Sequence, residues 1–349
     1  RGGQAHQVSL TSPAPAGSAG CGRVFWWAAL VETAARLPAD PGQARALAVF
    51  ETLRPLRADP EVLAAACLHQ WPALREALPA PVLAQAPRLK RLLEGLVAAG
   101  QVDDLHQHRP GQGSAEGLRR LLLALVRDLR AVLVLLAVQL VRLREAAALP
   151  EDERRALAEL TRDIHAPLAN RLGIWQLKWE LEDLAFRWLQ PDTYQRIARL
   201  LDEKRGDRER FIEDAMGRIR AALAEAGIAA DVAGRPKHIY SIWKKMQRKG
   251  VPFSELYDIR AVRVLVDDIP ACYAALGVVH QLWPSIPSEF DDYIAHPKGN
   301  DYRSLHTAVI GPEGKVLEVQ IRTHAMHEEA ELGVCAHWRY KGTDVKAGS

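Results

Sequence analysis

The sequence predicts a multidomain protein in which an all-α region is followed by an α+β region. Residues from about 23 to 190 read as helices rich in Ala, Leu and Arg, with breaks at Pro/Gly clusters. From residue 228 onward, short β-rich runs alternate with helical patterns, and the length of 349 residues allows two domains. We expect a flexible tail at 1–22, a helical domain at 23–190, a helical linker at 191–210, an α+β domain at 211–342 and a second tail at 343–349.

The α+β region contains four predicted strands separated by helices. Residue types that favour strands fall at 228–232, 260–266, 304–310 and 315–323, bounded by Gly, Pro or Asp. Helical patterns cover 211–226, 238–249, 270–282 and 324–334. This order predicts one sheet with helices packed against it.

Composition argues against several classes of protein. The net charge is only +3, so any basic site must be local and we expect no direct DNA binding. The four cysteines form no CxxC pair and no signal-peptide pattern opens the chain, so we expect a reducing, cytoplasmic location. The most apolar stretch, 121–144, is interrupted by Arg127, Asp128 and Arg130. We therefore predict a buried helix and no membrane span.

Residues 235–246 join a basic turn to a helix with one apolar and one basic face. Pro236 suits the first helical turn, where its missing N–H costs nothing. Arg235, Lys237 and His238 precede the helix, whose free N–H groups attract anions. The segment predicts a polyphosphate-binding cradle, and the alternative is a solvated basic face on an ordinary helix.

The strand at 315–323 alternates between an apolar and a polar face. The polar side chains are Glu318, Gln320 and Arg322. From the strand alone, an exposed polar face is favoured over the wall of an active site. Asp258 stands just before the strand at 260–266, where it is either a turn residue or a partner of Glu318 on a neighbouring strand. Two such carboxylates suit Mg²⁺, which prefers oxygen ligands shared with substrate phosphates.

The loop at 292–307 offers an aromatic ring, a cation and an amide in Tyr302, Lys298 and Asn300. Such a set can stack on a base and bind its phosphates or its edge. The alternative is a surface loop with a half-buried tyrosine. These residues make the loop a candidate nucleotide site.

Four runs, by their sequence, order and spacing, resemble the RelA/SpoT family of guanosine tetra- and pentaphosphate synthetases, and a fifth run in the helical half adds to the resemblance. The synthetase runs are RPKHIYSIWKKM (235–246), ELYDIRAVRV (255–264), PKGNDYRSLHTAV (297–309) and LEVQIRTHAMHEEAELGVCAHWRYK (317–341). The run IHAPLANRLGIWQLKWELEDLAFRWL (164–189) resembles the end of the family's hydrolase domain and the bridge after it. The resemblance covers about 24 to 342 and implies an HD-type helical domain followed by a nucleotidyltransferase-like mixed sheet.

The resemblance implies a GTP pyrophosphokinase of the stringent response, which transfers pyrophosphate from ATP to the ribose 3′-hydroxyl of GTP or GDP and releases AMP. Asp258 and Glu318 would bind Mg²⁺, and Glu318 would assist deprotonation of the hydroxyl. The implied ATP-binding residues are Arg235, Lys237, Ser241, Lys245 and Arg263. The implied GTP- or GDP-binding residues are Tyr302, which stacks on guanine, Lys298, Asn300 and His306. The implied supporting residues are His238, Lys244, Arg260, Gln320, Arg322 and His327.

The helical half departs from the hydrolysing members of the family, which hold a metal through a His-Asp pair, an upstream histidine and a later aspartate. Here Gln70 replaces the aspartate of the pair after His69, and no histidine occurs from residue 7 to 68. Val138-Gln139 stands where active members read Asp-Arg. Because several ligands are lost together, we predict an inactive pseudo-hydrolase domain.

An acidic motif distinguishes the synthetase-only members, and this chain carries it as Glu289-Phe290-Asp291-Asp292. We expect Glu289, Asp291 and Asp292 to alter the field near the guanosine site, and the alternative is a solvated acidic turn. Asp301 replaces the glycine that many members have before the tyrosine, a change we do not expect to abolish activity.

Long family members continue into domains that contact the ribosome and tRNA. None of these follows Ser349, so we expect those partners and ribosome-stimulated activation to be absent from this chain. The leading alternative function is a catalytically silent regulator that binds guanine nucleotides or the alarmone, which is guanosine tetra- or pentaphosphate. A bifunctional synthetase and hydrolase is a further alternative, and Gln70 and Val138 argue against it.

Overall fold

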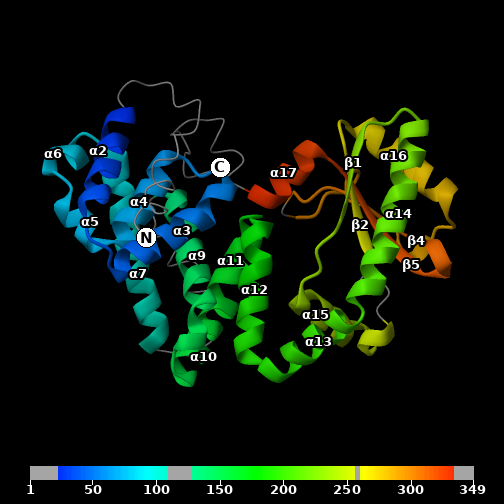
Figure 1. Ribbon diagram of the computed structural model, residues 1–349, viewed down its shortest axis with the longest axis horizontal. Helices are drawn as coiled ribbons and strands as arrows, with labels where there is room; N and C mark the ends of the chain where they lie inside the picture. The colour runs from blue at the N-terminus through cyan, green and yellow to red at the C-terminus, as the bar shows by residue number, and fades with distance from the viewer. Residues whose placement is uncertain (1–22, 109–127, 256–259, 300, 334–349) are drawn as a thin grey trace. The chain divides into compact units, whose positions relative to one another are not determined.

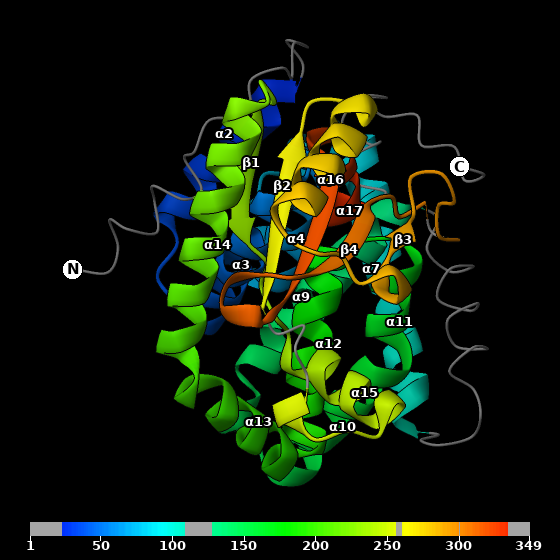
Figure 2. The ribbon, with the colours of Figure 1, turned by 90° about the vertical axis from the view of Figure 1, so that its right-hand side faces the viewer.

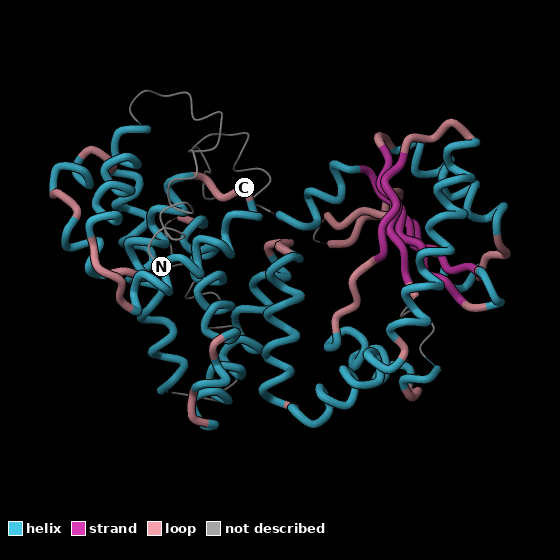
Figure 3. Tube along the Cα trace, in the orientation of Figure 1, coloured by secondary structure: helices cyan, strands magenta, loops and turns pink. Residues whose placement is uncertain are grey.

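The computed structural model describes residues 23–108, 128–255, 260–299 and 301–333. The chain divides between Ala169 and Asn170 into two compact units. Within the described residues the first unit is helical, and the strands gather into one sheet in the second unit (Figure 3). The predicted order of an all-α region followed by an α+β region is confirmed.

The first unit is built from short helices that begin with capping aspartates and prolines. The Asp40 carboxylate accepts a hydrogen bond from the backbone N–H of Gln43 at 2.8 Å, and the Asp59 carboxylate accepts one from the backbone N–H of Val62 at 2.9 Å. The described helices are α2 (Arg23–Arg36), α3 (Pro41–Leu53), α4 (Pro60–Gln70), α5 (Pro72–Ala77), α6 (Ala80–Ala84), α7 (Pro87–His108), α9 (Leu129–Arg144) and α10 (Glu151–Leu160). A π-helical turn (Thr161–His165) and α11 (Ala166–Arg171) follow α10.

The core of the first unit lies around α4 and α9, whose side chains are buried on nearly all sides. This agrees with the buried helix predicted at 121–144, of which residues 121–127 lie outside the described part. Within the described residues, no helix is long and apolar enough to cross a bilayer.

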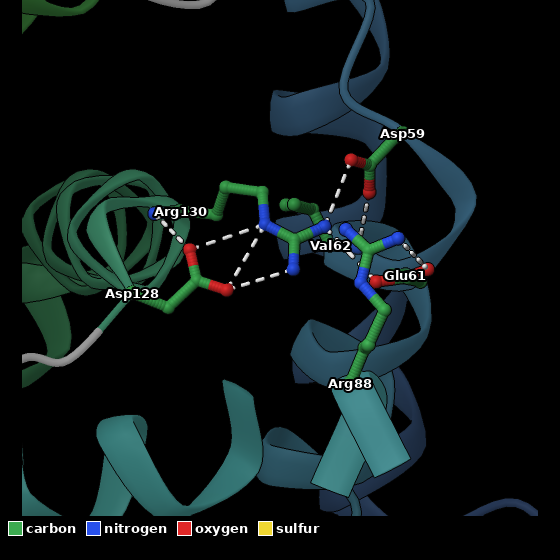
Figure 4. A network of polar contacts seen from close by, with 6 residues as sticks. All are labelled: Asp59, Glu61, Val62, Arg88, Asp128 and Arg130. Atoms are coloured by element: carbon green, nitrogen blue, oxygen red, sulfur yellow. Dashed lines mark hydrogen bonds and ion pairs between the residues drawn. The ribbon is translucent and has the colours of Figure 1, made fainter. Parts of the chain in front are cut away.

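A buried ionic cluster links α4 to the start of α9 (Figure 4). The Arg130 guanidinium lies 3.0 Å from both Asp59 and Glu61, and 2.7 Å from Asp128. Arg88 of α7 approaches the Glu61 carboxylate at 3.7 Å. Asp59 and Asp128 are also the N-caps of α4 and α9, so the cluster fixes two helix ends against each other.

The second unit holds a five-stranded sheet of order β1-β2-β5-β4-β3. The β2–β5 pair is parallel and the other pairs are antiparallel. The strands are β1 (Ala230–Gly234), β2 (Ala261–Val266), β3 (Asp291–Asp292), β4 (Leu305–Ile310) and β5 (Val316–Thr323). The four predicted strands are confirmed. The sequence missed β3, which is too short to show a strand pattern.

Helices α14 (Arg205–Glu225) and α16 (Ile269–Leu282) pack on the apolar face of this sheet (Figures 1 and 2). That face includes Leu317, Val319 and Ile321, as their alternation predicts. Helix α17 (His324–Leu332) lies toward the opposite, polar face (Figure 1). The sheet therefore separates an apolar core from a polar side.

Three further helices form a smaller core in the second unit. They are α12 (Trp175–Leu189), α13 (Pro191–Glu203) and α15 (Ile239–Lys249). Phe186, Ile197 and Ile242, one from each helix, are buried together. The predicted linker at 191–210 is helical in the structure, and the division between the units precedes α12, whereas the sequence placed the end of the helical domain at 190.

Candidate active site

A cavity of about 500 Å³ lies within the second unit, a volume typical of sites for small molecules. Most of the side chains predicted to bind nucleotide, and four of those predicted to support the site, line it. They are Arg235, Lys237, His238, Ser241, Arg263, Lys298, Tyr302, His306, Gln320, Arg322 and His327. The structure thus brings together residues that are far apart in the sequence.

Strand register aligns three of these side chains across the polar face of the sheet. Gln320 of β5 pairs with Arg263 of β2 on one side and with His306 of β4 on the other. Arg263 Nε donates to Gln320 Oε1 at 3.0 Å, and Gln320 Nε2 donates to the Tyr302 hydroxyl. The Tyr302 hydroxyl lies 2.9 Å from His306 Nε2. One chain of hydrogen bonds therefore joins a predicted ATP residue to two predicted guanosine residues.

The Glu318 carboxylate lies in a strongly basic setting. It forms an ion pair with Arg235, and Lys237 Nζ lies 3.7 Å from its Oε2 atom. Although burial alone would raise the pKa of Glu318, the charges of Lys237 and Arg235 lower it to about 2. Glu318 is therefore ionised at neutral pH.

Burial acts on the cations and histidine around this carboxylate. Burial lowers the pKa of Lys237 and of Lys245 to about 8, against the attraction of Glu318. His306 Nδ1 lies 3.8 Å from Glu318, yet burial and Arg235 lower the His306 pKa to about 3. His306 is therefore neutral at physiological pH, and the Tyr302 hydroxyl can donate to its Nε2 atom.

The polar face of β5 is buried, so the expectation of an exposed face is wrong. Gln320 and Arg322 each expose only 2% of their surface to solvent. The reason is that α17 packs against β5, and Arg322 contacts His327 of that helix at 2.6 Å. Burial lowers the pKa of Arg322 to about 10, and burial with Arg322 lowers that of His327 to about 4.

The first turn of α15 differs from the predicted phosphate cradle in one respect. The Tyr240 amide donates to Asp183 Oδ1 of α12 at 2.9 Å, so a carboxylate of the protein already satisfies this helix-terminal donor. The cations before the helix are thus presented to the cavity by their side chains. Ser241 also lines the cavity from this turn.

Some predicted residues lie away from the cavity. The Lys244 ammonium lies over the Tyr240 ring at 5.6 Å, and the Arg260 guanidinium over the Phe211 ring at 5.4 Å. Lys245 is not part of the lining, although its charge interacts with Glu318. Asp258 and Asn300 lie outside the described residues.

The acidic motif also lies outside the cavity lining. Asp292 accepts hydrogen bonds from the Ile294 and Ala295 amides and from the Tyr273 hydroxyl. It therefore organises the turn after β3. Asp291 pairs with His306 across β3 and β4, so it follows Arg263, Gln320 and His306 in register across the sheet. Glu289 is the last residue of the short helical turn before β3.

Sequence reasoning missed one wall of the cavity, which α12 supplies. Trp175, Trp179 and Asp183 follow one another at intervals of four residues and line the cavity from one face of this helix. The sequence carried this spacing as a signal, but the run at 164–189 was attributed to the helical domain and its bridge.

Of the two carboxylates predicted to bind Mg²⁺, Glu318 lies within the described residues, and a carboxylate oxygen is the kind of ligand that Mg²⁺ prefers. A carboxylate beside a cavity lined with cations can share a hard cation with bound phosphates. Within the described ranges no group of three His, Cys, Asp or Glu side chains converges on one point. Any Mg²⁺ would therefore rely on Glu318, on Asp258 outside those ranges and on the phosphates themselves.

In the first unit, the residues at the two positions predicted to have lost hydrolase ligands have separate sets of contacts. His69 Nδ1 lies 2.8 Å from Gln70 Nε2, and burial with the charge of Arg142 lowers the pKa of His69. Val138 is buried, and Gln139 donates to the Thr161 hydroxyl at 2.9 Å. The amide side chain of Gln70 and the aliphatic side chain of Val138 thus occupy positions where the family resemblance implies metal ligands in the hydrolysing members.

Comparison with known proteins gives two matching family models. Residues 26–175 match the HD domain, and residues 234–345 match the region found in RelA / SpoT proteins. Helix α12 lies almost entirely between these matches. In the solved structures, the small alarmone synthetase 1 from Bacillus subtilis is 26% identical, covers 42% of this chain and 81% of its own, and has a TM-score of 0.32.

Curated relatives match over most of the chain. GTP pyrophosphokinase from Escherichia coli K12 is 52% identical over 73% of this chain and 34% of its own length. GTP pyrophosphokinase from Photobacterium angustum is 46% identical over 86% and 41%. A probable guanosine-3′,5′-bis(diphosphate) 3′-pyrophosphohydrolase from Synechocystis is 42% identical over 88% and 40%. The chain spans less than half the length of these relatives.

Proposed function

Because this chain belongs to the RelA/SpoT family, we propose that its second unit is a (p)ppGpp synthetase. The unit would transfer pyrophosphate from ATP to the ribose 3′-hydroxyl of GTP or GDP and release AMP. The observation that carries this proposal is the Glu318 carboxylate held between Arg235 and Lys237 beside a cavity lined with cations. Phosphoryl-group transfer needs such fixed positive charge because the reaction consists mostly of positioning and charge stabilisation.

The ATP phosphates would bind the cations before and along α15 and on β2. Arg235, Lys237 and Ser241 line the cavity beside Arg263, and Lys245 adds charge from the next turn of the helix. Bound phosphates would compete with Glu318 for Arg235 and Lys237. That competition would free the carboxylate to accept the proton of the attacking hydroxyl.

The guanosine nucleotide would bind at Tyr302, Lys298, Asn300 and His306. The Lys298 ammonium lies 5.3 Å from the centroid of the Tyr302 ring, so a cation stands beside the predicted stacking surface. The hydrogen bonds from Gln320 and to His306 fix the Tyr302 hydroxyl and hence the plane of its ring. A fixed ring is a good platform for a purine because stacking then costs little entropy.

Glu318 and Asp258 would bind Mg²⁺, with the remaining positions filled by phosphate oxygens and water. When bound, the ion would neutralise phosphate charge. Arg235 and Lys237 would then be shared between the carboxylate and the substrate.

For the first unit we propose an inactive hydrolase domain. Gln70 and Val138 supply no metal ligand of the required kind, and the neighbouring Gln139 donates a hydrogen bond to Thr161. The test is Mn²⁺-dependent release of pyrophosphate from ppGpp. Release at a rate well above that of a heat-denatured sample would contradict the proposal.

The synthetase is tested by incubating the protein with Mg²⁺, ATP and GDP or GTP, and measuring AMP and a 3′-pyrophosphorylated guanosine. Glu318→Gln, which keeps the shape of the side chain, should abolish both products. Glu213→Gln on the exposed side of α14 is the matched control and should behave as wild type. Tight binding of guanine nucleotides without AMP formation would instead favour a silent regulator.

A further inference from the structure

Helix α12 contacts the segment that carries the predicted ATP-binding cations. It lies within the second unit and almost wholly outside both matched family regions. Of the cavity-lining residues that α12 contributes, Trp179 and Asp183 both contact His238, the residue at the start of α15. The contacts differ in kind, one being aromatic and the other polar.

Asp183 acts as a cap for a helix to which it does not belong. Helix α15 starts after His238, whose own side chain makes no capping bond. Asp183 Oδ1 accepts from the Tyr240 amide at 2.9 Å, and its Oδ2 lies 3.7 Å from His238 Nδ1. One carboxylate therefore holds both the first turn of α15 and the ring just before it.

Trp179 fixes the same ring from its face. The Trp179 and His238 rings are parallel to within 5° with centroids 5.0 Å apart. Further along α12, Phe186 packs against Trp243 of α15 at 5.0 Å between ring centroids. The start of α15 is thus held by α12 at a polar, a stacking and an apolar contact.

We propose that Asp183 and Trp179 are positioning residues for the segment 235–241, and that they set the affinity of the site for ATP. The proposal rests on the proposed function in naming ATP as the ligand of this segment. Arg235 and Lys237 stand directly before the anchored ring of His238, so loosening His238 would spread the positions of both cations. Asp183 contacts the ATP side at His238 and Tyr240. Trp179 also reaches the guanosine side through Trp175, whose ring centroid lies 5.2 Å from that of Trp179 and 5.6 Å from that of Tyr302. Asp183 is therefore the residue whose loss should separate the two substrates.

The first experiment compares Asp183→Ala with Asp183→Asn and with Asp192→Ala, an exposed aspartate in the first turn of α13. We expect Asp183→Ala to raise the KM for ATP about fivefold to tenfold, the size of a lost helix cap, with the KM for GDP unchanged. Asp183→Asn should recover most of the loss because its amide oxygen still accepts from the Tyr240 amide. Asp192→Ala should match wild type.

The same variants are compared by hydrogen exchange at the Tyr240 amide without nucleotide. Faster exchange in Asp183→Ala, restored in Asp183→Asn, is expected whether or not the protein makes product, so the positioning role is tested separately from the proposed function. Unchanged exchange, or an equal change of KM for both substrates, would overturn the proposal. Trp179→Phe, which keeps a stacking ring, should impair ATP binding less than Trp179→Leu, and the reverse order would also overturn it.

Discussion

The Arg235 guanidinium and the Glu318 carboxylate form an ion pair across two elements, the segment before α15 and strand β5. Their attraction, with that of Lys237, outweighs burial and lowers the pKa of Glu318 to about 2. The pair keeps a carboxylate charged next to the cavity, whose lining includes Arg235 but not Glu318, and it also holds Arg235 where a phosphate would need it.

Arg235→Gln should therefore affect both partners. Loss of a charged hydrogen-bond donor to phosphate should lower kcat/KM for ATP by about tenfold to a hundredfold, equivalent to roughly 1.5–3 kcal/mol. Removing the cation should also raise the pKa of Glu318. Initial rates at varied ATP measure the first effect, and Arg248→Gln, an exposed arginine near the end of α15, is the control. An unchanged KM and kcat would mean that Arg235 does not contact ATP.

The Tyr302 ring lies 5.6 Å from the Trp175 ring and is tied through its hydroxyl to Gln320 and His306. Tyr302→Ala should weaken binding of the guanosine nucleotide by about 1–3 kcal/mol if the ring stacks on guanine. Tyr302→Phe keeps the ring and should lose less. Titration with GDP and ATP separately measures both. A loss confined to ATP would show that the residue belongs to the other substrate.

Much of the second unit could be predicted because its signals are local. Alternation placed Leu317, Val319 and Ile321 in the core, and the strand parity of Glu318, Gln320 and Arg322 placed them on one polar side. Arg235, Lys237, Lys298 and Tyr302 were recognisable as site candidates from their types and positions, whereas Arg263, His306 and His327 were implied only by the family resemblance. The cavity then gathers most of them.

The missed features depend on contacts between distant segments. Whether Gln320 is exposed is decided by what packs over the strand, and alternation alone gives no information on that. The Tyr240 amide that Asp183 caps lies 57 residues further along the chain, so no local sequence pattern predicts this hydrogen bond. The same holds for Trp179, whose spacing along α12 shows a face but not its partner.

The ionic cluster of the first unit should contribute strongly to its stability. Arg130→Met leaves Asp59, Glu61 and Asp128 close together without their shared cation. Because breaking a buried ion pair leaves an uncompensated charge, the free energy of unfolding should fall by about 3–5 kcal/mol. Urea unfolding measures the loss of stability, and hydrogen exchange of the backbone amides in α4 and α9 shows where it occurs. Arg36→Met, an exposed arginine paired only with Glu32 on α2 in the described contacts, should change stability by less than about 1 kcal/mol.

The cluster should also respond to acid. Burial raises the pKa of Asp128, but the hydrogen bonds and charge of Arg130 lower it by more, so the pKa lies below its usual value. A group with a lowered folded pKa stabilises the fold above its unfolded pKa, and this contribution is lost as the pH falls through the folded pKa. The destabilisation caused by Arg130→Met should therefore be largest above the unfolded pKa of Asp128 and should shrink as the pH falls through the folded pKa. Urea unfolding monitored by circular dichroism at several pH values measures this, and a destabilisation that stays the same from neutral to acid pH would contradict the coupling.

ATP binding should take up protons at mildly alkaline pH. Burial lowers the pKa of Lys237 and of Lys245 to about 8, so both lysines are partly neutral at pH 8.5. A polyphosphate favours the charged lysines and raises both pKa values, so binding draws protons from the buffer and ATP affinity falls as the pH rises through 8.

Calorimetry in buffers of different ionisation enthalpy measures this uptake, which should be on the order of one proton at pH 8.5 and nearly zero at pH 6.5. Lys237→Met should reduce the uptake, whereas Lys90→Met, an exposed lysine of α7, should not. If uptake stays the same in Lys237→Met, the titrating group lies elsewhere. If no uptake occurs in wild type, then the phosphates do not reach these lysines, and the cations before α15 would have to serve the guanosine nucleotide instead.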